Sequence, residues 1–246
     1  MFKAIVAAGV VFAGILVVWF VLAYGWQNFW GGRGVEALCA KDGGLRIERT
    51  MLADGFLFDM PDLGDCQACV EYLTKFNFVF VDINVQTPSD RRDTSLPEIG
   101  YYRMSLSTEG DPICEAWLGD PRMQSARSSY GRFPLLPSQC VAIKKLPERP
   151  SGAVVDRVVE SVAVMGGQEV NLREWRLRVE PSGETLARIR DYTYMSKWAT
   201  YFDFSGGGGT TAFRCTNVRP GSPATLDALL LVLRPRSIDP SQAGER

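Results

Sequence analysis

The chain has 246 residues, a formal net charge of −1, six cysteines and no histidine. A net charge near zero offers no electrostatic basis for binding nucleic acid, because phosphate contacts need clustered lysine and arginine. The missing histidine excludes His-based catalytic triads, the commonest general base and the usual zinc ligand. We therefore assign no nucleic-acid partner, no metal site and no cofactor.

The N-terminal segment Ala4–Tyr24 contains no charged residue and is rich in Val, Ala, Ile and Leu. A run of about 20 apolar residues crosses a hydrocarbon core of about 30 Å. A cleaved signal peptide would have a shorter apolar region of about 7–15 residues and a small-residue cleavage site. A lipoprotein is also disfavoured, because the first cysteine, Cys39, follows Leu38 and lies well beyond the run. Residues 1–25 are therefore interpreted as a cytoplasmic stub and an uncleaved transmembrane signal anchor.

Two features of this segment suggest contacts in the membrane. Gly9, Ala13 and Gly14 are small, and Gly9 and Ala13 are four apart, so they share a helix face that another helix could approach closely. Ordinary membrane-span composition is the alternative explanation. At the far end of the run lie four aromatic residues, interpreted as anchors at the lipid–water interface rather than as a ligand site: Tyr24, Trp26, Phe29 and Trp30.

The orientation of the span follows from charge and from the cysteines. Lys3 and the N-terminal amine precede the span, the next basic residue is Arg33, and positive charge stays on the cytoplasmic side. All the cysteines fall on the other side of the span: Cys39, Cys66, Cys69, Cys114, Cys140 and Cys215. An even number of cysteines in an exported domain indicates disulfides formed in an oxidising compartment.

Beyond the span we expect a juxtamembrane linker at residues 26–34, a β-rich domain at 35–236 and a disordered tail at 237–246. Alternating or β-branched patterns predict strands at Leu45–Thr50, Phe78–Gln86, Tyr101–Ser107, Cys140–Leu146 and Val154–Met165.

The clearest hairpin joins Arg173–Glu180 to Thr185–Tyr194 through the turn Pro181–Glu184. In its first strand one face is apolar and the other is expected to be wetter. The apolar face carries Trp175, Leu177 and Val179, and the wetter face carries Glu174, Arg176 and Arg178.

Helix patterns are few. Asp65 is a good N-cap for a helix over Cys66–Phe76. The apolar run Ala228–Leu233 is either a second helix or a last strand. The predicted fold class is therefore mainly β, antiparallel, with one or two short helices, preceded by a single N-terminal transmembrane helix.

Three local patterns together resemble uncharacterised Gram-negative envelope proteins. They are the Cys-x-x-Asp-Gly-Gly opening within Cys39–Thr50, the stretch Gly183–Tyr194, and the glycine-rich loop ending in Phe-x-Cys at Gly206–Cys215. The resemblance covers the start and the last third of the exported domain and carries no activity. It implies one structural unit in which Cys39 pairs with Cys215. From the span, the charge bias and the cysteines, we expect a bacterial inner-membrane location with the N-terminus in the cytoplasm and the domain in the periplasm.

The stretch Asp65–Cys69 has two cysteines three positions apart. A helix N-terminus lowers a thiol pKa, which favours a redox pair, whereas the neighbouring Asp65 and Glu71 raise it. A thioredoxin-like context is missing, and Val70 stands where c-type haem attachment needs histidine. We interpret Cys66 and Cys69 as members of structural disulfides, and their partners stay open because six cysteines allow 15 connectivities. Redox work and half of a metal site remain the alternatives.

Two further patterns are assigned ordinary roles. The acidic residues Asp54, Asp59, Asp62 and Asp65 match no calcium loop and are typical of turns. The run Gly206–Gly209 lacks the Gly-Lys-Ser/Thr ending of a phosphate-binding loop.

The sequence therefore predicts a non-enzymatic accessory or scaffold subunit that presents a β domain to a larger envelope complex. Its expected partners are the lipid bilayer and other membrane-complex subunits. The alternatives are a membrane-tethered thiol–disulfide oxidoreductase that uses Cys66 and Cys69, and a periplasmic binding or sensing domain.

Overall fold

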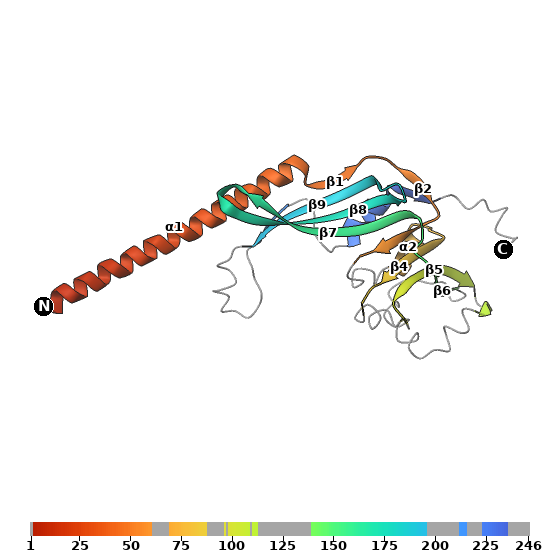
Figure 1. The fold of residues 1–246 in the computed structure, drawn as a ribbon, viewed down its shortest axis with the longest axis horizontal. Helices are drawn as coiled ribbons and strands as arrows, with labels where there is room; N and C mark the ends of the chain where they lie inside the picture. The colour runs from red at the N-terminus through yellow and green to blue at the C-terminus, as the bar shows by residue number, and fades with distance from the viewer. Residues whose placement is uncertain are drawn as a thin grey trace. The chain divides into compact units, whose positions relative to one another are not determined.

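The computed structural model describes residues 2–60, 69–87, 96, 98–108, 110–112, 139–195, 212–215 and 223–235. Within them the fold is mainly β and is preceded by one long apolar helix, which confirms the predicted fold class (Figure 1). The elements are α1 (Phe2–Asp42), β1 (Gly44–Ile47), β2 (Met51–Ala53), β3 (Gly55–Asp59), α2 (Cys69–Lys75), β4 (Phe80–Val85), β5 (Gly100–Thr108), β6 (Gln139–Lys145), β7 (Gly152–Val164), the 3-10 turn η2 (Met165–Gly167), β8 (Gln168–Glu180), β9 (Glu184–Met195), β10 (Ala212–Arg214), α6 (Pro223–Leu230) and β11 (Leu233–Pro235).

The helix α1 is continuous for 41 residues and includes the segment that the sequence suggested as a linker. Residues 26–34 are helical, even though a glycine inside a helix costs about 1 kcal/mol relative to alanine. Packing against the sheet offsets that cost. Each glycine of the segment lies against a side chain from the strands: Gly31 against Tyr194, Gly32 against Phe213 and Gly34 against Val164.

Within the described residues, nine strands form one mixed sheet in the order β1-β9-β8-β7-β3-β4-β5-β6, with β10 also paired to β9. A separate two-stranded sheet pairs β11 with β2 in parallel. The sheet is mixed because β3 runs parallel to both β4 and β7. Parallel neighbours need a crossover, and the chain passes from β3 to β4 by way of α2.

The chain forms two compact units. The first contains Met1–Gly44, Val159–Arg173 and Arg190–Val218, and the second contains Leu45–Val158, Glu174–Ile189 and Arg219–Arg246. Strands β7, β8 and β9 contribute residues to both. The core of the first unit is a cluster of buried residues, with Leu38 and Val164 packed against it: Val35, Val170, Leu172, Tyr192, Tyr194 and Cys215.

The second unit has an aromatic core built around β3 and α2. The Phe56 ring lies 5.9 Å from the Tyr72 ring and 5.2 Å from the Phe78 ring, and all three side chains are buried. The apolar run Ala228–Leu233, which the sequence predicted as either a helix or a last strand, is partly helix and partly strand. It belongs to α6 up to Leu230, and β11 begins at Leu233.

Candidate functional site

The second unit contains a cavity of about 430 Å³ beside Arg149. Its lining residues come from the segment before β7 and from the end of β8: Arg149, Pro150, Ser151, Arg178, Glu180 and Pro181. The guanidinium groups and the carboxylate among them belong to a continuous network of ion pairs.

Arg149 stands at one end of this network and contacts three strands. Its Nε and Nη2 donate to the Glu180 carboxylate at 2.8 and 3.0 Å. Nη2 also lies 2.7 Å from Asp59 at the end of β3, and Nη1 donates to the Tyr101 hydroxyl of β5 at 3.2 Å. A planar guanidinium presents several donors at fixed angles, so a single arginine can hold these elements together.

Asp156 on β7 continues the network. Arg178 lies 2.6 Å from both Asp156 and Glu180, and so joins the two carboxylates. Arg176 donates to Asp156 at 2.8 and 3.2 Å and lies 3.9 Å from Glu174. The carboxylates are mostly buried, and each one contacts at least one arginine.

This network occupies the β8 face that the sequence suggested would be wetter. The opposite face is apolar as expected, because Trp175 and Leu177 are 3% and 0% exposed. However, Glu174 is also buried, at 7% exposed, and Arg176 and Arg178 are only partly exposed. The alternation of apolar and polar residues along β8 predicted both faces. It could not show that other strands supply oppositely charged partners for the charged face.

The electrostatics of the network favour charge pairing over proton transfer. The two-pronged hydrogen bond with Glu180 raises the pKa of Arg149 above its usual range. The same bond holds the pKa of Glu180 below its usual value. An ionised carboxylate that already accepts from two arginines makes a poor general base at neutral pH. The charged groups that line the cavity are therefore already paired with one another.

The first unit contains the disulfide that the resemblance implies. Cys39 on α1 is bonded to Cys215, the residue after β10, with a Cα–Cα distance of 5.6 Å, and this confirms the pairing. Cys140 is also disulfide-bonded. Cys66 and Cys114 lie outside the described residues, and Cys69 is described only as the first residue of α2. The proposed roles of Cys66 and Cys69 stay predictions.

A buried carboxyl group lies next to the Cys39–Cys215 disulfide. Asp191 on β9 is 0% exposed, accepts a hydrogen bond from the Thr193 hydroxyl at 3.5 Å and another from the Cys215 backbone N–H. Its second oxygen, Oδ1, is buried and has no hydrogen-bond partner among the described residues. Burial raises the pKa of Asp191, although Arg214 and Arg173 act in the opposite direction. Sequence analysis did not single out this residue.

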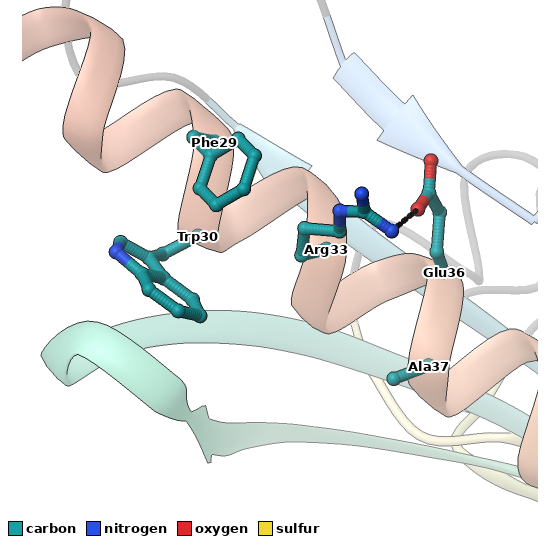
Figure 2. Close-up of a pocket in the computed structure, with 5 residues that line it drawn as sticks. All are labelled: Phe29, Trp30, Arg33, Glu36 and Ala37. Atoms are coloured by element: carbon teal, nitrogen blue, oxygen red, sulfur yellow. Dashed lines mark ion pairs between the residues drawn. The ribbon is translucent and has the colours of Figure 1, made fainter.

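Of the four predicted anchor aromatics on α1, Trp26 and Phe29 are exposed, whereas Tyr24 and Trp30 are half-buried. Trp26 and Phe29 are 60% and 52% exposed, and both meet the Trp30 ring edge to face, at 5.5 and 5.3 Å. A surface groove of about 580 Å³ follows, lined by Phe29, Trp30, Arg33, Glu36 and Ala37 (Figure 2). In Figure 2 the guanidinium of Arg33 points toward Glu36, which lies 3.7 Å away.

The small-residue face of α1 is open. A β-carbon placed on Gly9 or Gly14 would meet nothing within 4 Å in the described part of the chain, and Ala13 is exposed. Of the described helices, α1 is the one long and apolar enough to cross a membrane, and none of its apolar stretch is buried. The helix-packing role of these residues and the anchoring role of the aromatics stay predictions.

Metal ligands are not brought together in the part of the chain that the structure describes, where no group of three or more acidic, cysteine or histidine side chains could hold an ion. Of the four acidic residues considered for calcium, Asp59 pairs with Arg149, and Asp62 and Asp65 lie outside the described residues. Comparisons with protein-family models, curated proteins and solved structures found no match.

Proposed function

We propose that this protein is a single-pass bacterial inner-membrane subunit that presents its β domain in the periplasm to a larger envelope complex. It acts as an accessory or scaffold component rather than as an enzyme. The observation that carries the proposal is the continuity of α1. One helix contains the apolar stretch, reaches the core of the first unit and is bonded there through Cys39.

Three features support this proposal. A helix that runs unbroken from the apolar stretch into a folded unit holds that unit at a fixed place beside the membrane. The face that carries Gly9, Ala13 and Gly14 is open for a second helix, because small residues let helix backbones approach closely. The disulfide suits an oxidising compartment, which agrees with export of the β domain.

The proposal is tested by purifying the full chain from membranes in mild detergent and measuring the intact mass of the particle. We expect association with the membrane that resists alkaline carbonate, and at least one other protein in fixed stoichiometry. A variant with Gly9→Leu and Ala13→Leu keeps an apolar span but fills the small-residue face, so it should lose a partner that packs there. A particle of the chain alone, obtained with both proteins, would defeat the scaffold role.

The redox alternative is tested separately. The purified chain is alkylated briefly without reductant, and the modified cysteines are located by mass mapping. A scaffold role predicts that Cys66 and Cys69 stay unmodified because each is stably bonded. Rapid modification of either residue, together with exchange against a small disulfide, would instead favour thiol–disulfide chemistry.

A further inference from the structure

The tip of the β7–β8 hairpin lies beside the residues of α1 that follow the apolar run. Val164, near the end of β7, packs against Gly34, and Gly166 in the following turn packs against Trp30. Figure 2 shows the indole of Trp30 beside the hairpin ribbon. From Gly34 to Trp30 the contacts move toward the N-terminal end of α1. The hairpin therefore points back along the helix toward the apolar stretch.

The rise of the helix gives the position of this tip. Trp30 is six residues beyond Tyr24, the last residue of the apolar segment Ala4–Tyr24. At about 1.5 Å per residue, Trp30 lies roughly 9 Å further along the axis of α1. A bilayer of about 40–45 Å with a core of about 30 Å leaves roughly 5–7 Å of headgroup region on each side. The hairpin contact at Trp30 therefore lies roughly 2–4 Å beyond the outer edge of the headgroups, within reach of them.

The composition of the tip suits that position. Ser161–Gln168 contains no charged residue, and it is bounded by Glu160 and Glu169. The segment includes Val162, Val164 and Met165, and its Ala163, Gly166 and Gly167 are exposed. The same unit also exposes two large apolar side chains at the adjoining ends of β9 and β10, Met195 at 43% and Phe213 at 41%. Phe213 packs on Gly32, one turn from the tip.

We infer that Ser161–Gln168 is a second membrane contact, resting on the phospholipid headgroups of the leaflet from which α1 emerges. The inference rests on the proposed function, because it requires α1 to span the bilayer. The bilayer is the occupant that the geometry favours, since the tip points along the same helix that enters it. An uncharged turn with exposed glycines can approach headgroups without burying a charge, and its free backbone groups remain hydrogen-bonded to water and headgroups.

The inference is tested with an environment-sensitive fluorophore on the full chain. Gly167→Cys carries the probe at the tip, and Gly183→Cys carries it in the turn at the other end of β8. The two sites are matched, because their φ angles are +69° and +72° and, among the described residues, no atom lies within 4 Å of an added β-carbon. Val17→Cys reports on the span itself, since Val17 is 62% exposed on α1. The unsubstituted chain, labelled in the same way without reductant, reports any reaction at native cysteines.

Each labelled protein is reconstituted in vesicles of phosphatidylethanolamine and phosphatidylglycerol with a nitroxide on the headgroup or on the acyl chain of a minor lipid. We expect headgroup nitroxides to quench the probe at position 167 and to leave the probe at 183 bright. A probe at position 167 that headgroup nitroxides do not quench, with position 17 quenched by acyl-chain nitroxides, would overturn the hairpin contact and leave the anchor intact. A probe at position 17 that acyl-chain nitroxides do not quench would overturn the proposed anchor itself.

Discussion

The Cys39–Cys215 bond joins two residues that are 176 positions apart and buries Cys215 in the core of the first unit. A bridge across a long loop restricts the unfolded chain strongly, and native bridges typically contribute about 2–5 kcal/mol. We expect Cys39→Ser to lower the free energy of unfolding by that amount, measured by denaturant titration in detergent without reductant.

The double variant Cys39→Ser/Cys215→Ser is the matched control. It should unfold at nearly the same denaturant concentration as the single variant, because either change removes the same bond. A double variant that is as stable as the unsubstituted chain would mean that the bridge adds no stability.

Asp191 is expected to make the stability of the first unit depend on pH. Burial raises the pKa of its carboxyl above the ordinary value of 3.8, so the folded state holds the proton more tightly than the unfolded state. Stability therefore falls as the pH rises from 3.8 to the raised pKa, and it stays lower above that value. Asp191→Asn should remove this fall while keeping an acceptor for Thr193 and the Cys215 N–H.

Urea titrations of both proteins at a series of pH values from 3 to 8 measure the effect. Parallel curves for Asp191→Asn and the unsubstituted chain would show that Asp191 does not titrate during unfolding. The test belongs to this residue alone, because Asn cannot ionise and has nearly the same shape.

Individual residues were predictable from the sequence where a local pattern decides their role. Trp175 and Leu177 followed from alternation along a single strand. Asp191 did not, because its burial depends on Cys215 and on arginines from other strands. The role of Arg149 was not predictable either, since its partners Asp59 and Glu180 lie far away in the sequence.

At the scale of elements, the later part of α1 depends on close contact with the strands. A β-carbon placed on Gly31 would overlap the ring of Tyr194, whereas one on Gly25 would meet no described residue within 4 Å. We expect Gly31→Val to destabilise the first unit by about 1–3 kcal/mol, as overpacking typically does. Hydrogen exchange of the β9 amides measures the loss, and Gly25→Ala is the control that should leave exchange unchanged. Equal exchange in both variants would show that Tyr194 can move aside freely.

The ion-pair network joins β3, β5 and β8 through one arginine. Arg149→Met removes the donors to Asp59 and Glu180 but keeps an unbranched side chain. Hydrogen bonds to charged groups contribute about 1.5–3 kcal/mol. The Arg149 side chain is 34% exposed, so water screens the pairs and we expect a loss near the low end, about 1–2 kcal/mol. Thermal unfolding of the two proteins measures it.

The exposed pair between Lys145 and Glu98 supplies the control for this prediction, since Lys145→Met should not change the unfolding temperature measurably.

A second measurement is the dependence of stability on pH in the acid range. Arg149 holds the pKa of Glu180 below 4.5, so this carboxylate stabilises the fold above pH 4.5 and the stabilisation is lost as the pH falls through the lowered pKa. Arg149→Met should weaken that pH dependence. If the free energy of unfolding falls at low pH in Arg149→Met just as it does in the unsubstituted chain, then Arg149 does not lower the pKa of Glu180.

Some elements were predictable and others were not. The hairpin of β8 and β9 has a clear turn between two alternating runs, and the structure contains both strands. β3 was missed because Gly55–Asp59 is short and buried on both faces, so no alternation marks it. Helical structure at Gln27–Gly34 was missed because the stabilising contacts come from β9, β10 and β7, distant in sequence.

At the scale of the whole molecule, the proposed orientation in the membrane rests on Lys3 on one side of the apolar stretch and the Cys39–Cys215 disulfide on the other. A fusion of alkaline phosphatase to the C-terminus should be active in bacteria, because that enzyme needs an oxidising compartment. A fluorescent protein that matures only in the cytoplasm should stay dark at the same position. The opposite result for both reporters would reverse the assigned topology.

The position of the Cys39–Cys215 bond also sets the order of events during synthesis. In the proposed topology the N-terminal half of α1 enters the membrane before most of the β domain has been made. The glycines in its later half lie against Tyr194 and Phe213, which are translated long after them. The bond to Cys215 can form only once that residue has also crossed the membrane, so a partly synthesised chain carries an inserted helix whose juxtamembrane glycines are still uncovered.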